Sequence, residues 1–201
     1  MNIQKLVFIQ VIILSLQILL YFGSERFQKN PHNVERPVDK FIPVIPAFTL
    51  IYVLWFPLIF LFPIHLYQAS EEFYKVYLMA WLLIIAISIP IYLIYPTSFA
   101  RPKNVESLPL GWTLKVIYKY SYKGLNCMPS MHCSISTLVL LASIFCLGMP
   151  LLLRIIYGLI SFGIIVSTQF TKQHVLIDMV TGVFLGTFCY GFAWIGYLLI
   201  F

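Results

Sequence analysis

Long apolar runs separated by short polar stretches dominate the sequence. A hydrocarbon core of about 30 Å requires ~20 apolar residues in a helix, and six segments meet this length. They cover approximately residues 3–22, 44–67, 73–95, 130–148, 151–170 and 175–200. Within a bilayer, a helix satisfies all its backbone hydrogen bonds internally. The pattern therefore predicts an all-α integral membrane protein, with a six-helix bundle as a single domain over residues 1–201.

Local signals refine this bundle at three places. Pro46, Pro57 and Pro63 fall within the second segment and predict a kinked helix. The tight "GMP" turn at 148–150 predicts an antiparallel hairpin between the fourth and fifth helices. In "WTLKVIYKY", residues 112–120, apolar positions recur at helical spacing. This predicts a short amphipathic segment on the surface between the third and fourth helices.

The composition agrees with a membrane location and narrows the partners. The chain is 61% hydrophobic and 10% charged, whereas an ordinary soluble domain is about half apolar and roughly a quarter charged. A net charge of +6 favours anionic headgroups or an anionic substrate. No basic-aromatic motif of a nucleic-acid-binding module appears, so we expect no nucleic acid partner. The four cysteines form no C-x-x-C pair and no zinc pattern.

Polar residues interrupt the apolar pattern at the ends of three segments, all on one side of the predicted bundle. The stretches are "PTSFARPKN" at 96–104, "NCMPSMHCS" at 126–134 and "STQFTKQHVLID" at 167–178. Ionisable residues within membrane spans are functional candidates by default. Because three separate helix ends carry them to the same side, we predict an active site there.

The residue types in these stretches suit an anionic ligand. Ser130 stands at a predicted helix start, where free N–H groups bind anions, and His132 lies one turn or less inside it. Arg101 offers a planar fork of donors that matches phosphate oxygens. His174 and Asp178, at i and i+4, face the same way. The carboxylate can hold one imidazole nitrogen and present the other as a base or nucleophile.

Each feature alone has a simpler explanation. A histidine near a helix start is often an interfacial or capping residue, and a His–Asp pair at i,i+4 is often only a helix ion pair. An Arg-Pro pair after a span commonly anchors to headgroups. Ser167 and Thr171, which share the helical face of His174 and Asp178, are equally typical of helix packing. The prediction of a site rests on their combination.

The order R-P, P-S-x-H and S-x6-H-x3-D resembles the type 2 phosphatidic acid phosphatase superfamily of lipid phosphatases and phosphotransferases. The usual family pattern is K-x6-R-P, P-S-G-H and S-R-x5-H-x3-D, and the resemblance covers the third through sixth predicted spans. The three motifs together are specific, whereas any one alone is weak.

The resemblance implies a membrane lipid-phosphate phosphatase that uses no metal and no cofactor. In such an enzyme His174 attacks phosphorus and becomes a phosphohistidine, Asp178 orients it, and His132 protonates the leaving oxygen. The expected phosphate-binding groups are Arg101, Ser130, Met131 through its backbone N–H, Ser167, Lys172 and Lys103. The implied partners are a lipid phosphate and the bilayer.

The sequence departs from the family pattern at three positions. Ile94 stands where the first-motif lysine is usual, Met131 replaces the glycine of P-S-G-H, and Thr168 replaces the arginine of the third motif. Lys172 and Lys103 are the candidates to supply the missing positive charge.

Two other functions remain open. The "TKQH" form of the third motif resembles the branch with inositol phosphorylceramide synthase-like and sphingomyelin synthase-like transferases, which move a phosphorylated headgroup to another alcohol. The lost cationic residues also allow a non-catalytic lipid-binding or transport protein with a degraded site.

The sidedness of the site receives conflicting signals. Ten of the 13 Lys and Arg residues fall on the side of the three motifs, which by the positive-inside rule would be cytoplasmic. Bacterial members of the superfamily carry their site on the outer face. We follow the resemblance, because Arg101 and Lys172 are candidates for substrate binding rather than for setting topology. We therefore expect a multi-pass cell-membrane protein with cytoplasmic termini and an extracytoplasmic site.

Overall fold

The computed structural model describes residues 3–121 and 124–200 and shows a helical bundle. Five helical stretches are long and apolar enough to cross a membrane. They are α1 (Ile3–Ser24), the stretch Pro46–Ala69, α4 (Glu71–Ile94), α7 (Leu151–Phe170) and α8 (Leu176–Ile200). The sixth predicted segment forms α6 (Met131–Phe145), a shorter apolar helix of 15 residues. The protein is therefore a helical, multi-pass type of membrane protein.

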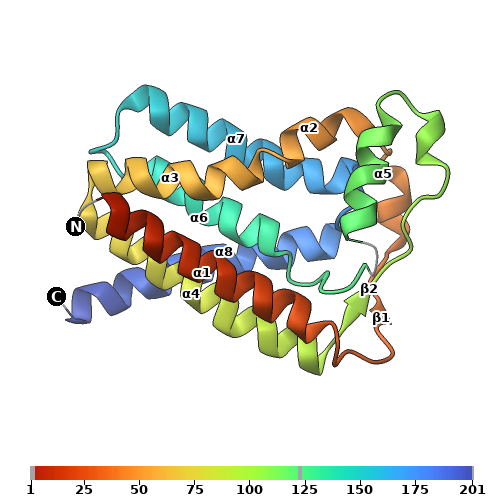
Figure 1. The fold of residues 1–201 in the computed structure, drawn as a ribbon, viewed down its shortest axis with the longest axis horizontal. Coiled ribbons are helices and arrows are strands. Elements are labelled where there is room, and N and C mark those ends of the chain that lie inside the picture. Colours follow the sequence, from red (N-terminus) through yellow and green to blue (C-terminus); the bar gives the residue numbers. More distant parts are fainter. Residues whose placement is uncertain (1–2, 122–123, 201) are drawn as a thin grey trace.

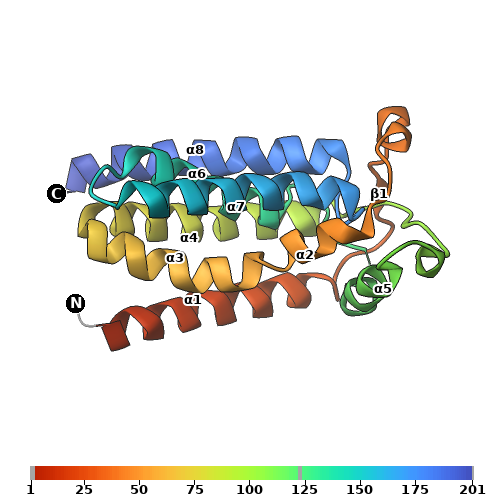
Figure 2. The same ribbon diagram turned by 90° about the horizontal axis from the view of Figure 1, so that it is seen from above.

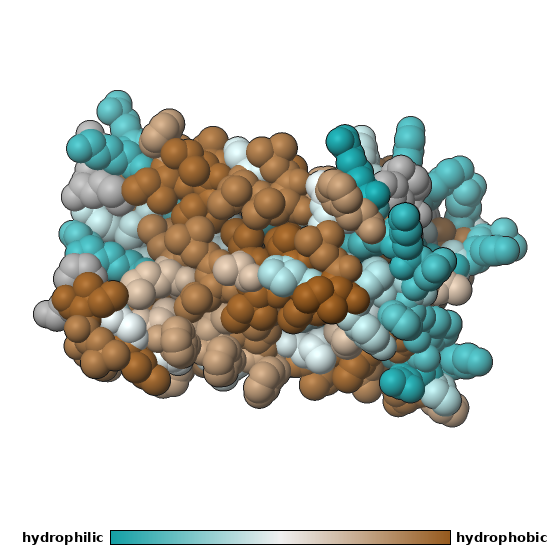
Figure 3. Space-filling model, turned by 90° about the horizontal axis from the view of Figure 1, so that it is seen from below, coloured by the Kyte–Doolittle hydropathy of each residue, from teal (hydrophilic) through white to brown (hydrophobic). Residues whose placement is uncertain are grey.

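The long helices lie side by side along one axis of the molecule, and both chain termini lie at the same end (Figure 1). The opposite end carries the surface helix α5 (Gly111–Tyr120) and the short strands β1 (His32–Asn33) and β2 (Thr97–Ser98), as a second view confirms (Figure 2). One face of the molecule shows a broad apolar zone between these ends, with hydrophilic residues gathered most densely at the end that carries α5 (Figure 3). This division is the one expected of a bundle that crosses a bilayer.

The second predicted span is interrupted where its prolines require it. The 3-10 turn η2 (Pro46–Phe48) leads into α2 (Thr49–Tyr52), and α3 (Trp55–Ala69) begins after a two-residue turn. Pro57 has no N–H to donate to the carbonyl of Val53, so the regular helix cannot continue through that point. The predicted distortion is present, and it places α2 beside α7 at the end of the bundle that carries α5.

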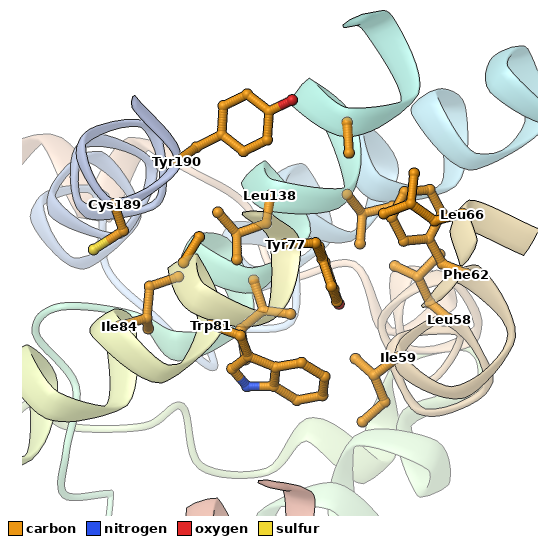
Figure 4. Close-up of a cluster of buried hydrophobic side chains, with 14 of the residues drawn as sticks. Leu58, Ile59, Phe62, Leu66, Tyr77, Trp81, Ile84, Leu138, Cys189 and Tyr190 are labelled. Carbon is orange, nitrogen blue, oxygen red and sulfur yellow. The ribbon is translucent and has the colours of Figure 1, made fainter. Parts of the chain in front are cut away.

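Large apolar side chains fill the centre between α3, α4, α6 and α8. Phe62, Tyr77, Trp81 and Leu138 are almost fully buried there (Figure 4). Phe62 and Tyr77 meet edge to face with ring centroids 5.6 Å apart, which is a favourable arrangement for two aromatic rings. This core fixes α6 in the middle of the bundle.

Two glycines bring α6 and α8 into unusually close contact. A Cβ added at Gly182 would lie 2.6 Å from the carbonyl oxygen of Ser130, and one at Gly186 would lie 2.5 Å from that of Ser134. Small residues four apart allow membrane helices to approach in this way. The close packing holds the first turns of α6 and α8 together, and these turns carry His132 and Asp178.

The connections at the α5 end are tied to each other. Strand β1 pairs in parallel with β2, which joins the segment after α1 to the segment after α4. The first connection continues into the 3-10 turn η1 (Pro37–Phe41), and the second into η3 (Val105–Ser107) before α5. Lys123, one of the ten basic residues predicted for this side, lies outside the described residues.

Candidate active site

The first turns of α6 and α8 and the end of α7 meet at the α5 end of the bundle. The backbone N–H of Ser130, the N-cap of α6, donates to the backbone carbonyl of Asp178 in the first turn of α8 (3.1 Å). A helix N-terminus carries a partial positive charge and free N–H donors. At α8 these donors already bind the carboxylates of Asp39 and Asp178, so the terminus open to an anionic ligand is that of α6.

His174 lies in the short turn between α7 and α8, and Asp178 lies next to it in the first turn of α8. The backbone N–H of His174 donates to the carbonyl of Thr168 (3.2 Å), which folds the turn back onto α7. The Nδ1 atom of His174 lies 3.4 Å from Oδ2 of Asp178, and the same carboxylate oxygen accepts from the N–H of Val175 (3.1 Å). Both side chains are buried. The carboxylate is thus positioned to orient the imidazole, as the i,i+4 spacing predicts.

The structure brings His132 to the same place from α6. The rings of His132 and His174 lie 5.9 Å apart, centroid to centroid, so both can reach one small ligand group. Nε2 of His132 is 2.9 Å from the hydroxyl of Tyr52, and its ring packs 4.6 Å from that of Trp55. Tyr52 and Trp55, which flank the break between α2 and α3, therefore fix the orientation of His132.

Arg101 joins the end of α5 to the turn that carries His174. Its guanidinium donates to the carbonyl and hydroxyl oxygens of Ser121 and to Oε1 of Gln173 (3.2 Å), the residue before His174. It lies over the ring of Tyr118, 5.0 Å from the centroid. Burial raises the pKa of Tyr118 to about 12, so its hydroxyl stays protonated and donates to the carbonyl of Thr171 (2.8 Å).

Asp39, in η1, holds the turn that contains His174. Its Oδ1 accepts from the N–H of Leu176, the first residue of α8 (2.8 Å), and its backbone carbonyl accepts from the ammonium of Lys172 (2.7 Å). Partial burial lowers the pKa of Lys172, while the charges of Asp39 and Glu35 oppose this shift. Lys172 therefore connects η1 to the α7–α8 turn in this structure.

The other predicted residues lie at the start of α6, near the end of α7, or on the surface. Ser130 and Met131 are buried at the start of α6, and the Ser130 hydroxyl accepts from the N–H of Cys133 (3.3 Å) as a helix cap. The hydroxyls of Ser167 and Thr171 donate to carbonyls one turn earlier on α7, as packing hydroxyls do. Lys103 is exposed. The structure thus brings His132, His174, Asp178 and Arg101 to one region. Ser167, Lys172 and Lys103 do not point to it: they bond α7, bond Asp39, and face solvent, respectively.

Several buried polar atoms of the site have no hydrogen-bond partner among residues 3–121 and 124–200. They are Nδ1 of His174, Oδ1 of Asp178, Nε of Arg101 and Nε2 of Gln173. Leaving a buried polar atom unpaired costs about 1–3 kcal/mol, and catalytic hydrogen bonds often tighten only when a ligand is bound. Of the four, Nε of Arg101 and Nε2 of Gln173 are donors that an anionic ligand can pair with, whereas Nδ1 of His174 faces Oδ2 of Asp178 at 3.4 Å.

Four functionally placed residues were not predicted from the sequence. Tyr52 and Trp55 lie in an apolar segment where aromatic residues are ordinary, and Asp39 and Gln173 are single polar residues in connections. The G-x-x-x-G spacing of Gly182 and Gly186 is typical of close helix packing, but it does not point to any of these four residues. The positions of the four residues depend on long-range contacts.

Within the described residues, no three His, Cys, Asp or Glu side chains come together as a metal site. In comparisons with known proteins, no family model matches the chain, and neither a curated protein nor a solved structure matches it. Function therefore has to be inferred from the residues of the site.

Proposed function

We propose that the protein is a membrane lipid-phosphate phosphatase that works through a phosphohistidine. The observation that carries the proposal is the pair of half-buried His132 and buried His174, with ring centroids 5.9 Å apart and Asp178 behind His174. The N-terminus of α6 carries His132, and Arg101 binds Gln173, the residue before His174. This combination provides a nucleophile, an acid and positive charge for one phosphate group, in the order of the superfamily motifs.

In the proposed first step, His174 attacks phosphorus while the bond to the lipid oxygen breaks. Asp178 orients the imidazole and stabilises its developing positive charge. Protonated His132 gives its proton to the leaving oxygen, so that a neutral lipid alcohol departs. Arg101 and the backbone N–H groups of Met131 and His132 at the start of α6 hold the phosphate oxygens, where preorganised donors are most effective.

In the second step, water attacks the phosphohistidine, the P–N bond breaks, and neutral His132 takes the proton of the water. Inorganic phosphate leaves, and both histidines return to their first states. The mechanism requires only side chains of this protein, and neither Ser167 nor Lys103 is needed to complete it. Lys172 acts in it by holding the α7–α8 turn against Asp39.

A transferase is the second candidate, because the same phosphohistidine could pass its phosphoryl group to an alcohol instead of water. For a transferase that moves a whole headgroup, the attacked phosphorus would carry a second ester. The departures at Ile94 and Thr168 from the phosphatase pattern favour this alternative. A non-catalytic binding protein is less consistent with the site, since binding alone does not require a carboxylate placed 3.4 Å from the imidazole of His174.

The test is a phosphate-release panel with the purified protein. Phosphatidate, phosphatidylglycerophosphate and a polyprenyl diphosphate are supplied as substrates, with diacylglycerol and inositol added as acceptors. We expect release of phosphate from at least one lipid and none from His174→Ala. Transfer to an acceptor without release would favour the transferase, and neither release nor transfer would contradict the proposal.

We also propose that α6 completes a six-crossing topology and that α5 lies on the membrane surface. On α5, Trp112, Lys119 and Tyr120 are exposed while Leu114 is buried, as on an interfacial helix. By resemblance to the superfamily, the α5 end faces outward from the cell membrane and the termini face the cytoplasm.

An impermeant thiol reagent tests this orientation in intact cells. The four natural cysteines are buried, so a cysteine introduced at Lys119 should give the main signal. We expect Lys119→Cys to react and a cysteine introduced near the C-terminus, at Leu199, to be protected. Protection at residue 119 with reaction at residue 199 would reverse the proposed orientation.

A further inference from the structure

A cavity of about 510 Å³ lies directly beside the candidate site. His132 and Met131, at the start of α6, form its inner wall together with Tyr52 and Trp55. The other lining residues come from α1, the α2–α3 region and α5, and most of them are apolar. Cavities of roughly 300–1,000 Å³ with apolar walls and few polar groups are typical of sites for small ligands.

The cavity runs along α1 and is bordered by residues that face lipid. Its lining along α1 extends from Leu14 to Phe22, with Glu25 just after the helix, which corresponds to roughly 16 Å at 1.5 Å per residue. Ile18 and Phe56 line it and are also exposed on the outer surface of the bundle. These residues place the cavity next to the lipid-facing surface of α1 and of the start of α3.

On the sides that do not face lipid, the cavity is closed by a polar contact toward α4 and by residues of α5. Gln17 lines the cavity and its side-chain oxygen accepts from the indole N–H of Trp81 (2.6 Å), which closes the wall toward α4. At the α5 end, Val116, Ile117 and Ser121 cover it. Ser121 is also the residue that binds Arg101, so the covering helix is connected to the candidate phosphate site.

We propose that this cavity holds one hydrocarbon chain of the lipid substrate, which enters sideways from the bilayer between α1 and α3. The inference rests on the proposed function. In that mechanism His132 protonates the oxygen that carries the lipid, so the lipid must depart on the side of His132. The cavity begins at His132 and is apolar, and it lies next to a surface where lipid chains are already present. A second chain, where the substrate has one, stays in the bilayer.

Selectivity for chain length follows from this placement. Each methylene group moved from water into an apolar site changes affinity by up to about fourfold. For substrates presented as monomers in water, the Michaelis constant should fall as the chain lengthens and then level off when the cavity is full. An aryl phosphate without a chain should not use the cavity at all.

Two neighbouring variants on α1 provide a matched test. Ile18→Trp places a large ring in the cavity, whereas Leu19→Trp adds the same ring at a lipid-facing position that does not line it. We expect Ile18→Trp to raise the Michaelis constant at least tenfold for a long-chain monoacyl phosphate and to leave hydrolysis of an aryl phosphate unchanged. Leu19→Trp should match the parent on both. Unchanged chain-length dependence in Ile18→Trp would overturn the proposal.

A binding measurement keeps this test separate from the test of catalysis. A monoacyl phosphate with a photoreactive diazirine near the end of its chain is crosslinked to the protein, and the labelled residues are mapped. We expect adducts between residues 14 and 25 that excess unlabelled monoacyl phosphate removes and that Ile18→Trp abolishes. Such adducts without any phosphate release would contradict the phosphatase and keep the chain site. Phosphate release with adducts spread evenly over lipid-facing residues would keep the phosphatase and contradict the chain site.

Discussion

Each end of the bundle carries a histidine beside a hydrogen-bonding neighbour, and the two differ in what surrounds them. At the end with the termini, Nδ1 of His65 on α3 lies 2.7 Å from the hydroxyl of Tyr157 on α7 and 3.0 Å from the carbonyl of Leu61. At the α5 end, His174 has a buried carboxylate, a second histidine and an arginine nearby.

The difference lies in the unpaired atoms. Near His65, polar groups pair locally, and Arg154 donates to the carbonyls of Ser143 and Ile144 at the end of α6. Around His174, several buried polar atoms lack a partner in the described part of the chain. Buried hydroxyls without a partner also occur away from the site, at Tyr77 and Tyr190, so a histidine within a membrane segment indicates a site only where such atoms belong to ionisable groups and their neighbours. Substitutions at both ends can test this distinction.

The largest effect is expected at the nucleophile. His174→Ala should abolish phosphate release from every substrate, because no phosphohistidine can form. His65→Ala, the matched change at the other end, should keep the rate of the parent. Both rates are measured by phosphate release, and incorporation of radioactive phosphate detects the intermediate. Turnover by His174→Ala, or equal loss in His65→Ala, would remove the contrast between the two ends.

Removing the partner of His174 should lower turnover, whereas removing the partner of His65 should not. Asp178→Asn should lower the turnover number by about 10⁴-fold, as when an amide replaces the carboxylate that orients a catalytic histidine. Tyr157→Phe removes the hydroxyl beside His65 and should leave turnover unchanged. Single-turnover rates, with thermal unfolding as the check on folding, make the comparison. A loss below tenfold in Asp178→Asn would mean that the pair is only a helix contact.

The role of His132 predicts an effect that depends on the leaving group. His132→Ala should slow the first turnover on a lipid phosphate by about 10²–10⁴-fold, because the lipid alkoxide is a poor leaving group without a proton. An aryl phosphate releases a stabilised phenolate, so its first turnover should be slowed much less. His65→Ala should leave the first-turnover rates on both substrates unchanged. Equal losses on the two substrates in His132→Ala would remove the assignment as general acid.

The smallest effect is expected at Lys172. A charged hydrogen bond contributes about 1.5–3 kcal/mol, and Lys172→Ala loses the bond to the Asp39 carbonyl. Turnover should fall about tenfold together with the thermal unfolding temperature, because the α7–α8 turn is held less firmly. Lys40→Ala, an exposed lysine in the same 3-10 turn as Asp39, is the control. A raised Michaelis constant with unchanged unfolding temperature would instead identify Lys172 as a phosphate ligand.

Much of the architecture follows from the sequence because its signals are local. Apolar runs of sufficient length predict membrane helices, and the runs at 3–22 and 151–170 match α1 and α7 closely. The tight "GMP" turn predicts the hairpin of α6 and α7, and the i,i+4 spacing predicts the approach of His174 to Asp178. The segment at 130–148 is less regular, since its helix ends at Phe145.

The sequence by itself determined the apolar spans, the single side on which the polar residues gather, and the chemical types available there. The tertiary structure decided which of these residues meet. Close packing at Gly182 and Gly186 places His132 beside His174, and the ammonium of Lys172 donates to the Asp39 carbonyl. It also forms the cavity beside His132, from helices more than a hundred residues apart. The physical reason is range: helix formation and burial depend on neighbours in sequence, whereas hydrogen-bond partners and cavities depend on contacts made only when the helices pack.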